Sequence, residues 1–156
     1  MSNGNVFISG ASRGIGNSIA YHFAENDYVV VGTSRHEFEF DKKIKNLIPL
    51  KLDVTSREDI QNCFNDLKTK NLLPDILINN AGITSDQIFL RMKDEEWDKV
   101  IDTNLNGVFN LSKIFVKNMI KNKKGRIINI SSISGLMGNP GQVNYSSSKS
   151  ALNGFT

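Results

Sequence analysis

Two residues four positions apart, Tyr145 and Lys149, have side chains that could carry out acid–base chemistry together. If the segment is helical, residues at this spacing share one face of the helix. The phenol of an unperturbed tyrosine has a pKa of ~10, and a neighbouring ammonium group stabilises its phenolate form. Such a phenol can protonate a carbonyl oxygen while hydride arrives at the carbon. The pair therefore indicates an oxidoreductase, although this spacing also arises readily by chance.

A second candidate site lies near the N-terminus, where Gly10, Gly14 and Gly16 follow a short apolar run. Glycines allow a sharp turn and let backbone N–H groups approach a pyrophosphate closely. A helix that begins at Gly14 would add the positive end of its dipole. The spacing differs from the usual G-x-G-x-x-G fingerprint, so the motif alone is weak support. Its place directly after the first expected strand favours a dinucleotide site.

The residues after the second expected strand bear on which dinucleotide would bind. An NAD site usually has an acidic residue ~20 residues beyond the glycine turn, where it binds the ribose hydroxyls. Here the strand ends in Ser34 and Arg35 with no acid at its tip, and Arg13 lies within the glycine turn. Two guanidinium groups favour a 2′-phosphate, so we expect NADP(H) as cofactor. The alternative is that Arg35 is a solvated loop charge.

Two further polar residues occupy positions that could belong to a site. Asn104 lies on the apolar stripe of a long expected helix, so its amide should be buried and bonded to a backbone group or a water. It could equally be a purely structural asparagine. Ser132 follows the fifth expected strand, at the end where open parallel sheets bind ligands. The pattern does not rank it above its neighbours Ser131 and Ser134.

Short apolar runs alternate with amphipathic segments along the chain. We expect strands at residues 5–9, 28–33, 48–52, 76–79 and 126–131. We expect helices at residues 14–26 with Ile15 facing inward, after a Ser56 cap, at 93–122 and from about Asn144 onward. This alternation predicts an α/β fold with a doubly wound parallel sheet of Rossmann type. Residues 34–47 are too few and too polar for a crossover helix, so we expect an irregular connection there.

Composition limits the classes of protein to which the chain could belong. Its 156 residues, 39% hydrophobic and 22% charged, suit one globular domain. A net charge of +3 is too small to indicate nucleic-acid binding. Cys63 lies on an apolar helix stripe and the two histidines have no ligand-spaced partner, so we expect neither a disulfide nor a metal site. We expect no membrane span, no leader and a cytoplasmic location.

At these motifs the sequence resembles the short-chain dehydrogenase/reductase family over its whole length. The segment Ser9–Gly16 is similar to the family's cofactor turn, Asp53-Val54 to the pair beside the adenine, and Asn80-Ala81-Gly82 to the motif that steadies the sheet against the cofactor. Together with the arguments above, the resemblance implies cofactor contacts from Gly10, Ser12, Arg13, Gly14, Ile15, Gly16, Ser34, Arg35, Asp53, Val54, Asn80, Ala81, Gly82, Tyr145 and Lys149.

The resemblance also assigns roles to four residues that match the family's catalytic positions. Ser132 and Tyr145 would bind the keto oxygen of the substrate, with Tyr145 as the proton donor. Lys149 would bind the nicotinamide ribose and pass protons to Tyr145. Asn104 would hold a water in that relay.

Within the family, residues 80–84, 91–97 and 137–145 are most similar to the 3-oxoacyl-[acyl-carrier-protein] reductases. This implies NADPH-dependent reduction of a 3-oxoacyl thioester in fatty-acid synthesis, and a homo-oligomer like the tetramers of full-length relatives. The basic cluster Lys121, Lys123, Lys124 and Arg126 would dock the acidic carrier protein; the alternative is a solvated helix end.

Family members continue with further strands and helices beyond the position of Thr156. We therefore expect residues 1–156 to form a single NADP(H)-binding domain, incomplete at its C-terminal end, after the fifth strand and the start of the following helix. Two alternatives to the reductase stay open. One is a dinucleotide-binding module without turnover, and the other is a reductase of a different carbonyl compound, such as an acyl-CoA, a sugar or a small alcohol.

Overall fold

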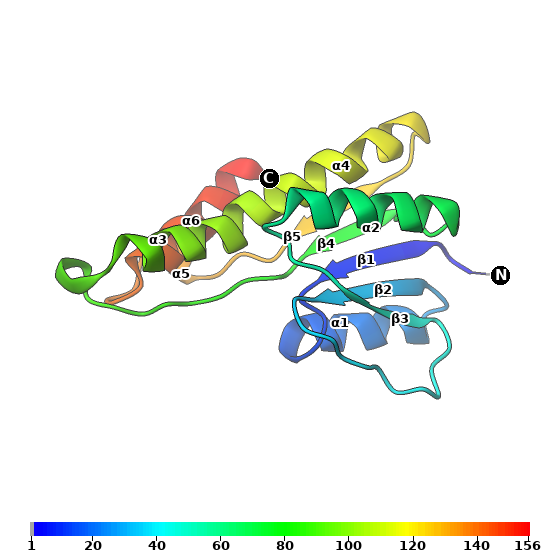
Figure 1. Cartoon of the computed structure of the whole chain (residues 1–156), viewed down its shortest axis with the longest axis horizontal. Coiled ribbons are helices and arrows are strands. Elements are labelled where there is room, and N and C mark those ends of the chain that lie inside the picture. Colours follow the sequence, from blue (N-terminus) through cyan, green and yellow to red (C-terminus); the bar gives the residue numbers. More distant parts are fainter. Residues whose placement is uncertain (1) are drawn as a thin grey trace.

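Runs of β-branched and aliphatic residues form the five strands of one parallel sheet. In the computed structural model, which describes residues 2–156, these are β1 (Asn5–Ser9), β2 (Val29–Ser34), β3 (Leu47–Lys51), β4 (Ile76–Asn79) and β5 (Arg126–Asn129). Their order is β3-β2-β1-β4-β5, and every neighbouring pair is parallel (Figure 1). The chain builds outward from β1 to β3 and then returns to β4, so the strand order reverses between β1 and β4. The doubly wound fold is confirmed.

Helices cover both faces of this sheet because successive strand residues point to opposite sides. Phe7 packs on one face with α2 (Arg57–Thr69) and α4 (Gly107–Lys121). Val6 and Ile8 pack on the other face, which α1 (Gly14–Glu25) covers. The expected Ser56 cap is present, since its hydroxyl accepts the Asp59 N–H at 3.1 Å.

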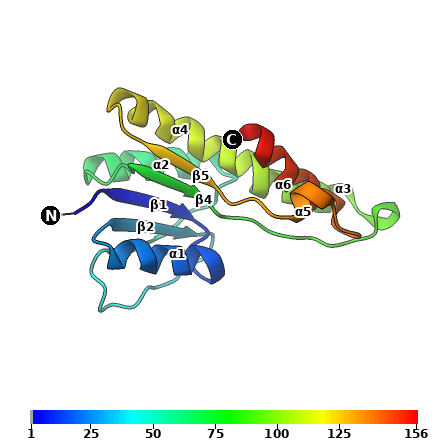
Figure 2. The same cartoon turned by 180° about the vertical axis from the view of Figure 1, so that it is seen from behind.

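The long helical stretch expected at residues 93–122 is present but is not continuous α-helix. It consists of α3 (Asp94–Ile101), a π-helical segment η2 (Asp102–Asn106) and α4. The last helix, α6 (Val143–Phe155), lies beside α3, and both extend past the carboxyl ends of the strands (Figure 2). Two short elements were not expected, the 3₁₀ turn η1 (Phe89–Arg91) and α5 (Ser134–Met137).

Residues 35–46 form the irregular connection that the sequence predicts. Phe40 from this connection is buried and packs edge-on against Tyr21 of α1, so a loop side chain closes the core where a crossover helix is absent. Cys63 is buried on α2, and burial raises the pKa of its thiol to about 12. Within residues 2–156, no helix combines the length and the apolar character that crossing a bilayer requires.

Candidate active site

Two adjoining cavities lie at the carboxyl ends of the strands, which is where doubly wound sheets bind ligands. The larger has a volume of about 690 Å³ and lies over the β1–α1 turn and the ends of β2 and β4. The smaller, of about 430 Å³, extends toward α6. Both are lined by Arg13, Ile15, Asn80, Gly82 and Ile83.

Close backbone packing explains the glycines of the β1–α1 turn. Gly10 has φ of 72°, and a Cβ there would lie 2.8 Å from the Ala81 Cα. A Cβ on Gly16 would overlap the Gly10 carbonyl oxygen and the Asn80 Nδ2. Because neither position has room for a side chain, the turn passes directly against the loop that follows β4.

Side-chain hydrogen bonds tie this turn to the loop after β4. The Asn80 Nδ2 donates to the carbonyl oxygens of Ser9, at 3.1 Å, and Gly10, at 2.8 Å. In the other direction, the Ser9 hydroxyl accepts the N–H groups of Asn80, at 3.1 Å, and Ala81, at 3.0 Å. The two loops that border the larger cavity are therefore held as one unit.

The N-terminus of α1 opens onto the larger cavity without a side-chain cap. Arg13 is the N-cap residue and makes no capping hydrogen bond, and the first turn has no acidic residue. The N–H groups and the helix dipole are thus available to an anion. Together with the glycine cradle, this fits the pyrophosphate of a dinucleotide.

Ile15 does not face inward as expected, because 64% of its surface is exposed and it lines both cavities. It belongs to the first turn of α1, which lies beyond the end of the sheet, so no core is available on that side. The inward face of α1 instead begins with Ile19 and Ala20, which pack in the core. Ile15 gives the cavity an apolar wall.

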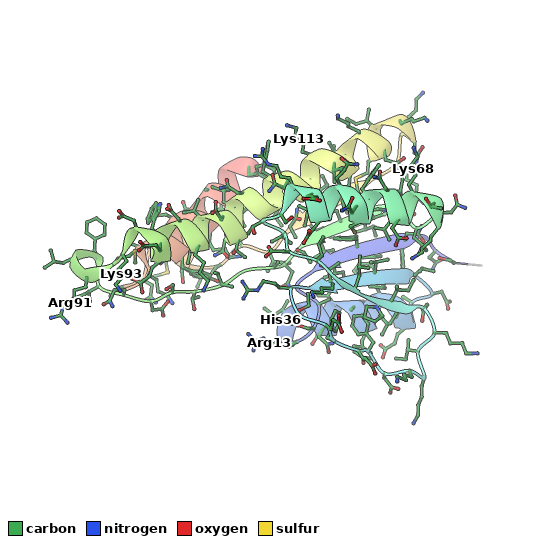
Figure 3. All side chains as sticks on the ribbon, in the orientation of Figure 1. Arg13, His36, Lys68, Arg91, Lys93 and Lys113 are labelled. Carbon is green, nitrogen blue, oxygen red and sulfur yellow. The ribbon has the colours of Figure 1, made fainter. Side chains whose placement is uncertain are left out.

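The expected cofactor-binding residues, apart from Gly16, all line one of the two cavities. Ser34 and Arg35 lie at the end of β2 and line the larger cavity together with Arg13. Figure 3 shows Arg13 near His36, another lining residue that the sequence analysis did not select. Gly16 is buried beneath the turn, where it provides space and makes no part of the cavity wall.

Helix α6 brings Tyr145 and Lys149 to the smaller cavity, one helical turn apart. The Lys149 Nζ lies 5.8 Å from the centroid of the Tyr145 ring and donates to the Ile130 carbonyl oxygen at 2.7 Å. Only 4% of the Lys149 surface is exposed, and this burial lowers the pKa of its ammonium from the ordinary 10.5. The phenol and the amine therefore lie at one wall of the same cavity.

Asn104 is fully buried in η2, and its amide is bonded to backbone groups as the sequence predicts. Its Oδ1 accepts the Ile83 N–H at 2.8 Å, and its Nδ2 donates to the Ile83 carbonyl oxygen at 3.0 Å and to the Ser148 hydroxyl at 3.0 Å. Single π-helical turns within α-helices often occur at functional sites. Here the π segment places the Asn104 amide against the loop after β4, which lines both cavities.

Ser132 is partly buried, and its hydroxyl accepts the Ser134 N–H at 3.2 Å. Its neighbour Ser131 lines the smaller cavity, and the Ser131 hydroxyl donates to the Lys149 carbonyl oxygen at 2.9 Å. The structure thus brings Tyr145 and Lys149 together at the smaller cavity. The serine that lines this cavity is Ser131, and the selected Ser132 is the next residue along the chain.

Lining residues outside the selected set include Ile83, Thr84, Thr103 and also Ser131, which the sequence left unranked beside Ser132. All but Thr84 adjoin a residue that was selected. Position after a selected motif, at the carboxyl end of a strand, would have been a usable signal for Ile83 and Ser131.

The basic cluster of Lys121, Lys123, Lys124 and Arg126 lies where α4 ends and β5 begins (Figure 1). This is at the amino ends of the strands, whereas the cavities lie at the carboxyl ends. The Lys124 Nζ pairs with the Asp75 Oδ1 at 3.2 Å. The cluster of one chain therefore does not border its own cavities.

Comparisons with known proteins agree with this geometry. A family model described as short chain dehydrogenase matches residues 4–156. The 3-oxoacyl-[acyl-carrier-protein] reductase FabG of Escherichia coli (strain K12) is 44% identical over 155 residues, and that of Vibrio cholerae serotype O1 is 42% identical over 155 residues. Each alignment covers 97% of this chain and 64% of the relative, so the chain spans less than two thirds of their length.

A solved structure shows the same arrangement of the backbone. The structure of 4-hydroxyisoleucine dehydrogenase complexed with NADH superposes with a TM-score of 0.90 at 37% sequence identity, and the match covers 99% of this chain and 66% of that one. The parallel sheet, the glycine turn and the matched family model lead to one conclusion: the chain belongs to the short-chain dehydrogenase family.

Proposed function

We propose that this chain provides the cofactor-binding and catalytic part of an NADPH-dependent reductase of 3-oxoacyl thioesters carried on acyl carrier protein. The observation that supports this most strongly is the Tyr145–Lys149 pair at the wall of a cavity that adjoins the glycine turn. The substrate class follows from the similarity to the FabG reductases, which are 3-oxoacyl-[acyl-carrier-protein] reductases by name.

Bound NADPH would supply the hydride, and side chains of this protein would donate the proton to the carbonyl oxygen. The Tyr145 phenol donates its proton to the carbonyl oxygen, and the buried Lys149 ammonium stabilises the phenolate that remains. The Ser132 hydroxyl accepts a bond from Ser134 and keeps its own hydrogen, which it can donate to the same oxygen. The Asn104 amide already uses both its N–H groups within the protein, so a relay water would have to bind its oxygen or its backbone.

The preference for NADP(H) is part of the proposal. Arg13, Ser34 and Arg35 line the same cavity, where two guanidinium groups and a hydroxyl suit a 2′-phosphate. The alternative is NAD(H), the cofactor named for the similar 4-hydroxyisoleucine dehydrogenase structure. R35A should weaken NADPH binding about tenfold and leave NADH binding unchanged. Equal affinity of the original chain for the two dinucleotides, measured by calorimetry, would reject the NADP(H) preference.

The catalytic proposal is tested by following NADPH oxidation with acetoacetyl-carrier protein as substrate. Y145F should lower kcat by about 100-fold or more and keep NADPH affinity, because only the proton donor is lost. The matched control is Y28F, since Tyr28 packs against Phe23 on the far side of the sheet from α6. Turnover retained in Y145F would show that Tyr145 is not the proton donor.

The same assay separates the alternatives. NADPH binding without turnover would favour a dinucleotide-binding module, and faster reduction of acetoacetyl-CoA than of the carrier-protein form would favour another carbonyl substrate. Reversal of charge at Lys123 and Lys124 should slow only the carrier-protein reaction, and equal loss with both substrates would reject docking at the basic cluster. A homo-oligomer in the cytoplasm completes the proposal, and sedimentation analysis tests its assembly.

A further inference from the structure

One buried hydroxyl joins two of the residues placed in the proposed site. Ser148 is fully buried on α6, directly before Lys149. Its hydroxyl accepts a hydrogen bond from the Asn104 Nδ2 at 3.0 Å and donates one to the Tyr145 carbonyl oxygen at 2.7 Å. Its neighbour Ser147 is exposed on the same helix. The link from η2 to the Tyr145 turn of α6 is therefore specific to Ser148.

The hydrogen bonds around Asn104 leave one arrangement for its amide. Its Oδ1 must face the Ile83 N–H, and one hydrogen of its Nδ2 must face the Ile83 carbonyl oxygen. The second hydrogen of the Nδ2 is directed to Ser148. If the Ser148 hydroxyl were removed, this hydrogen would remain buried without an acceptor. The free-energy cost of that lost bond would favour rotation or displacement of the amide.

Rotation of the Asn104 amide would change the electrostatic field at the Lys149 ammonium. A Cβ built on Gly82 would lie 3.3 Å from the Asn104 Oδ1 and 3.5 Å from the Lys149 Nζ. The two polar groups therefore both lie beside Gly82, which lines both cavities. In a buried site the interaction between a dipole and a charge is weakly screened, so a change in the amide alters the field at the ammonium.

We propose that Ser148 is a positioning residue of the proposed reductase. Its hydroxyl fixes the rotation of the Asn104 amide and connects η2 to the turn of α6 that carries Tyr145 and Lys149. This inference rests on the proposed function, because it assigns Ser148 a role in that same site. Ser148 acts through Asn104 and Tyr145 and does not line either cavity.

The test compares S148A with S147A, which removes a hydroxyl from the exposed neighbouring position. We expect S148A to lower kcat by about tenfold while KM and NADPH affinity stay within twofold of the original chain, and S147A to leave all three unchanged. A purely structural loss would appear as a lower melting temperature without this split between kcat and KM. Unchanged kcat in S148A, or an equal loss in S147A, would overturn the inference.

A second readout needs no substrate and separates this inference from the proposed function. The Ile83 N–H is bonded to the Asn104 Oδ1, so its hydrogen exchange should become at least about tenfold faster in S148A and remain unchanged in S147A. If the original chain reduces no 3-oxoacyl thioester, the proposed function fails and this exchange rate decides the inference. Equal exchange in the two variants rejects it. Where S148A does not fold, S148C keeps a weak donor and acceptor at this position, weakens both hydrogen bonds and is judged by the same two readouts.

Discussion

The two halves of the candidate site are built on opposite principles. The glycine turn, residues 10–16, takes its shape from side chains that are absent, because a Cβ at Gly10 or Gly16 would run into backbone or into Asn80. The polar cluster, which comprises Asn104, Asn144, Tyr145, Ser148 and Lys149, takes its shape from side chains that are present. Four of these five side chains are buried, and each of those four makes a hydrogen bond.

This difference determines how each half should respond to substitution. In the glycine turn the limit is space, so the smallest added group is costly and its polarity is irrelevant. In the polar cluster the volume can be preserved while a buried donor or acceptor loses its partner, so the cost comes from desolvation. Variants of matched size can therefore separate a steric constraint from a hydrogen-bonding one.

The largest effect is expected from Gly16→Ala. The new Cβ would overlap the Gly10 carbonyl oxygen and the Asn80 Nδ2, and the turn would have to open. We expect a loss of about 3 kcal/mol in the free energy of unfolding and at least a tenfold loss of NADPH affinity. Denaturant unfolding and calorimetry measure the two effects.

Gly154→Ala is the matched control, because Gly154 lies within α6 and a Cβ there meets no atom within 4 Å. This variant should be neutral or more stable by up to about 1 kcal/mol, since alanine favours a helix interior. If Gly16→Ala has the unfolding midpoint and NADPH affinity of the original chain, the steric account of the glycine turn is wrong.

A smaller effect, of about 1–3 kcal/mol, is expected from N144D. The Asn144 Nδ2 donates to the carbonyl oxygens of Ser85, at 2.9 Å, and Glu96, at 3.3 Å, while its Oδ1 accepts the Tyr145 N–H at 2.8 Å. The substitution keeps the size and turns a carboxylate oxygen toward two carbonyl oxygens. N153D, at an exposed position of α6, is the control.

The pH dependence of N144D has a defined sign. Burial and the facing carbonyl oxygens disfavour the charged form of the introduced carboxyl, so its pKa is raised in the folded state. A raised folded pKa means that the folded chain binds the proton more tightly, so stability is lost as pH rises through that pKa. The deficit relative to the original chain should be smallest near about pH 4 and largest at neutral pH. A deficit that does not change with pH would show that the carboxylate escapes to solvent.

The contrast between the two halves also explains what the sequence could reveal. The glycine turn is local, since its glycines, the preceding strand and the following helix are adjacent in the chain, and its place was predicted. The burial of Asn104 was also predicted, because an apolar stripe surrounds it. Its partners were not, since Ile83 is 21 residues away and Ser148 is 44 residues away. Those contacts depend on how the loop after β4 and helix α6 pack on η2, which no local pattern encodes.

Errors in the helices have a similar origin. Ile15 satisfies the apolar period of α1, yet it lies beyond the end of the sheet and is exposed, because periodicity does not show where the core stops. The π turn η2 interrupts a stretch whose apolar pattern looks continuous. The elements η1 and α5 have three and four residues, too few for any period to show.

The smallest effect on stability is expected from K149M. This variant measures the free-energy cost of burying the Lys149 ammonium in the polar cluster. Burial lowers the pKa of Lys149 below its ordinary 10.5, so between the two values the unfolded chain binds more protons and stability rises with pH. The titration of Lys149 should therefore add stability to the original chain as pH approaches 10.5. K149M lacks this group and should not show that gain. The lost bond to Ile130 offsets the relief of the buried charge to within about 1 kcal/mol near neutral pH.

The control is K117M, at an exposed position of α4, and denaturant midpoints across the alkaline range provide the measurement. The difference between K149M and the original chain should move in favour of the original chain as pH rises, whereas K117M should show no such trend. A difference that is constant with pH would mean that the ammonium is held without penalty. Burial of Lys149 would then carry no desolvation cost, and the distinction between the two halves would fail at this residue.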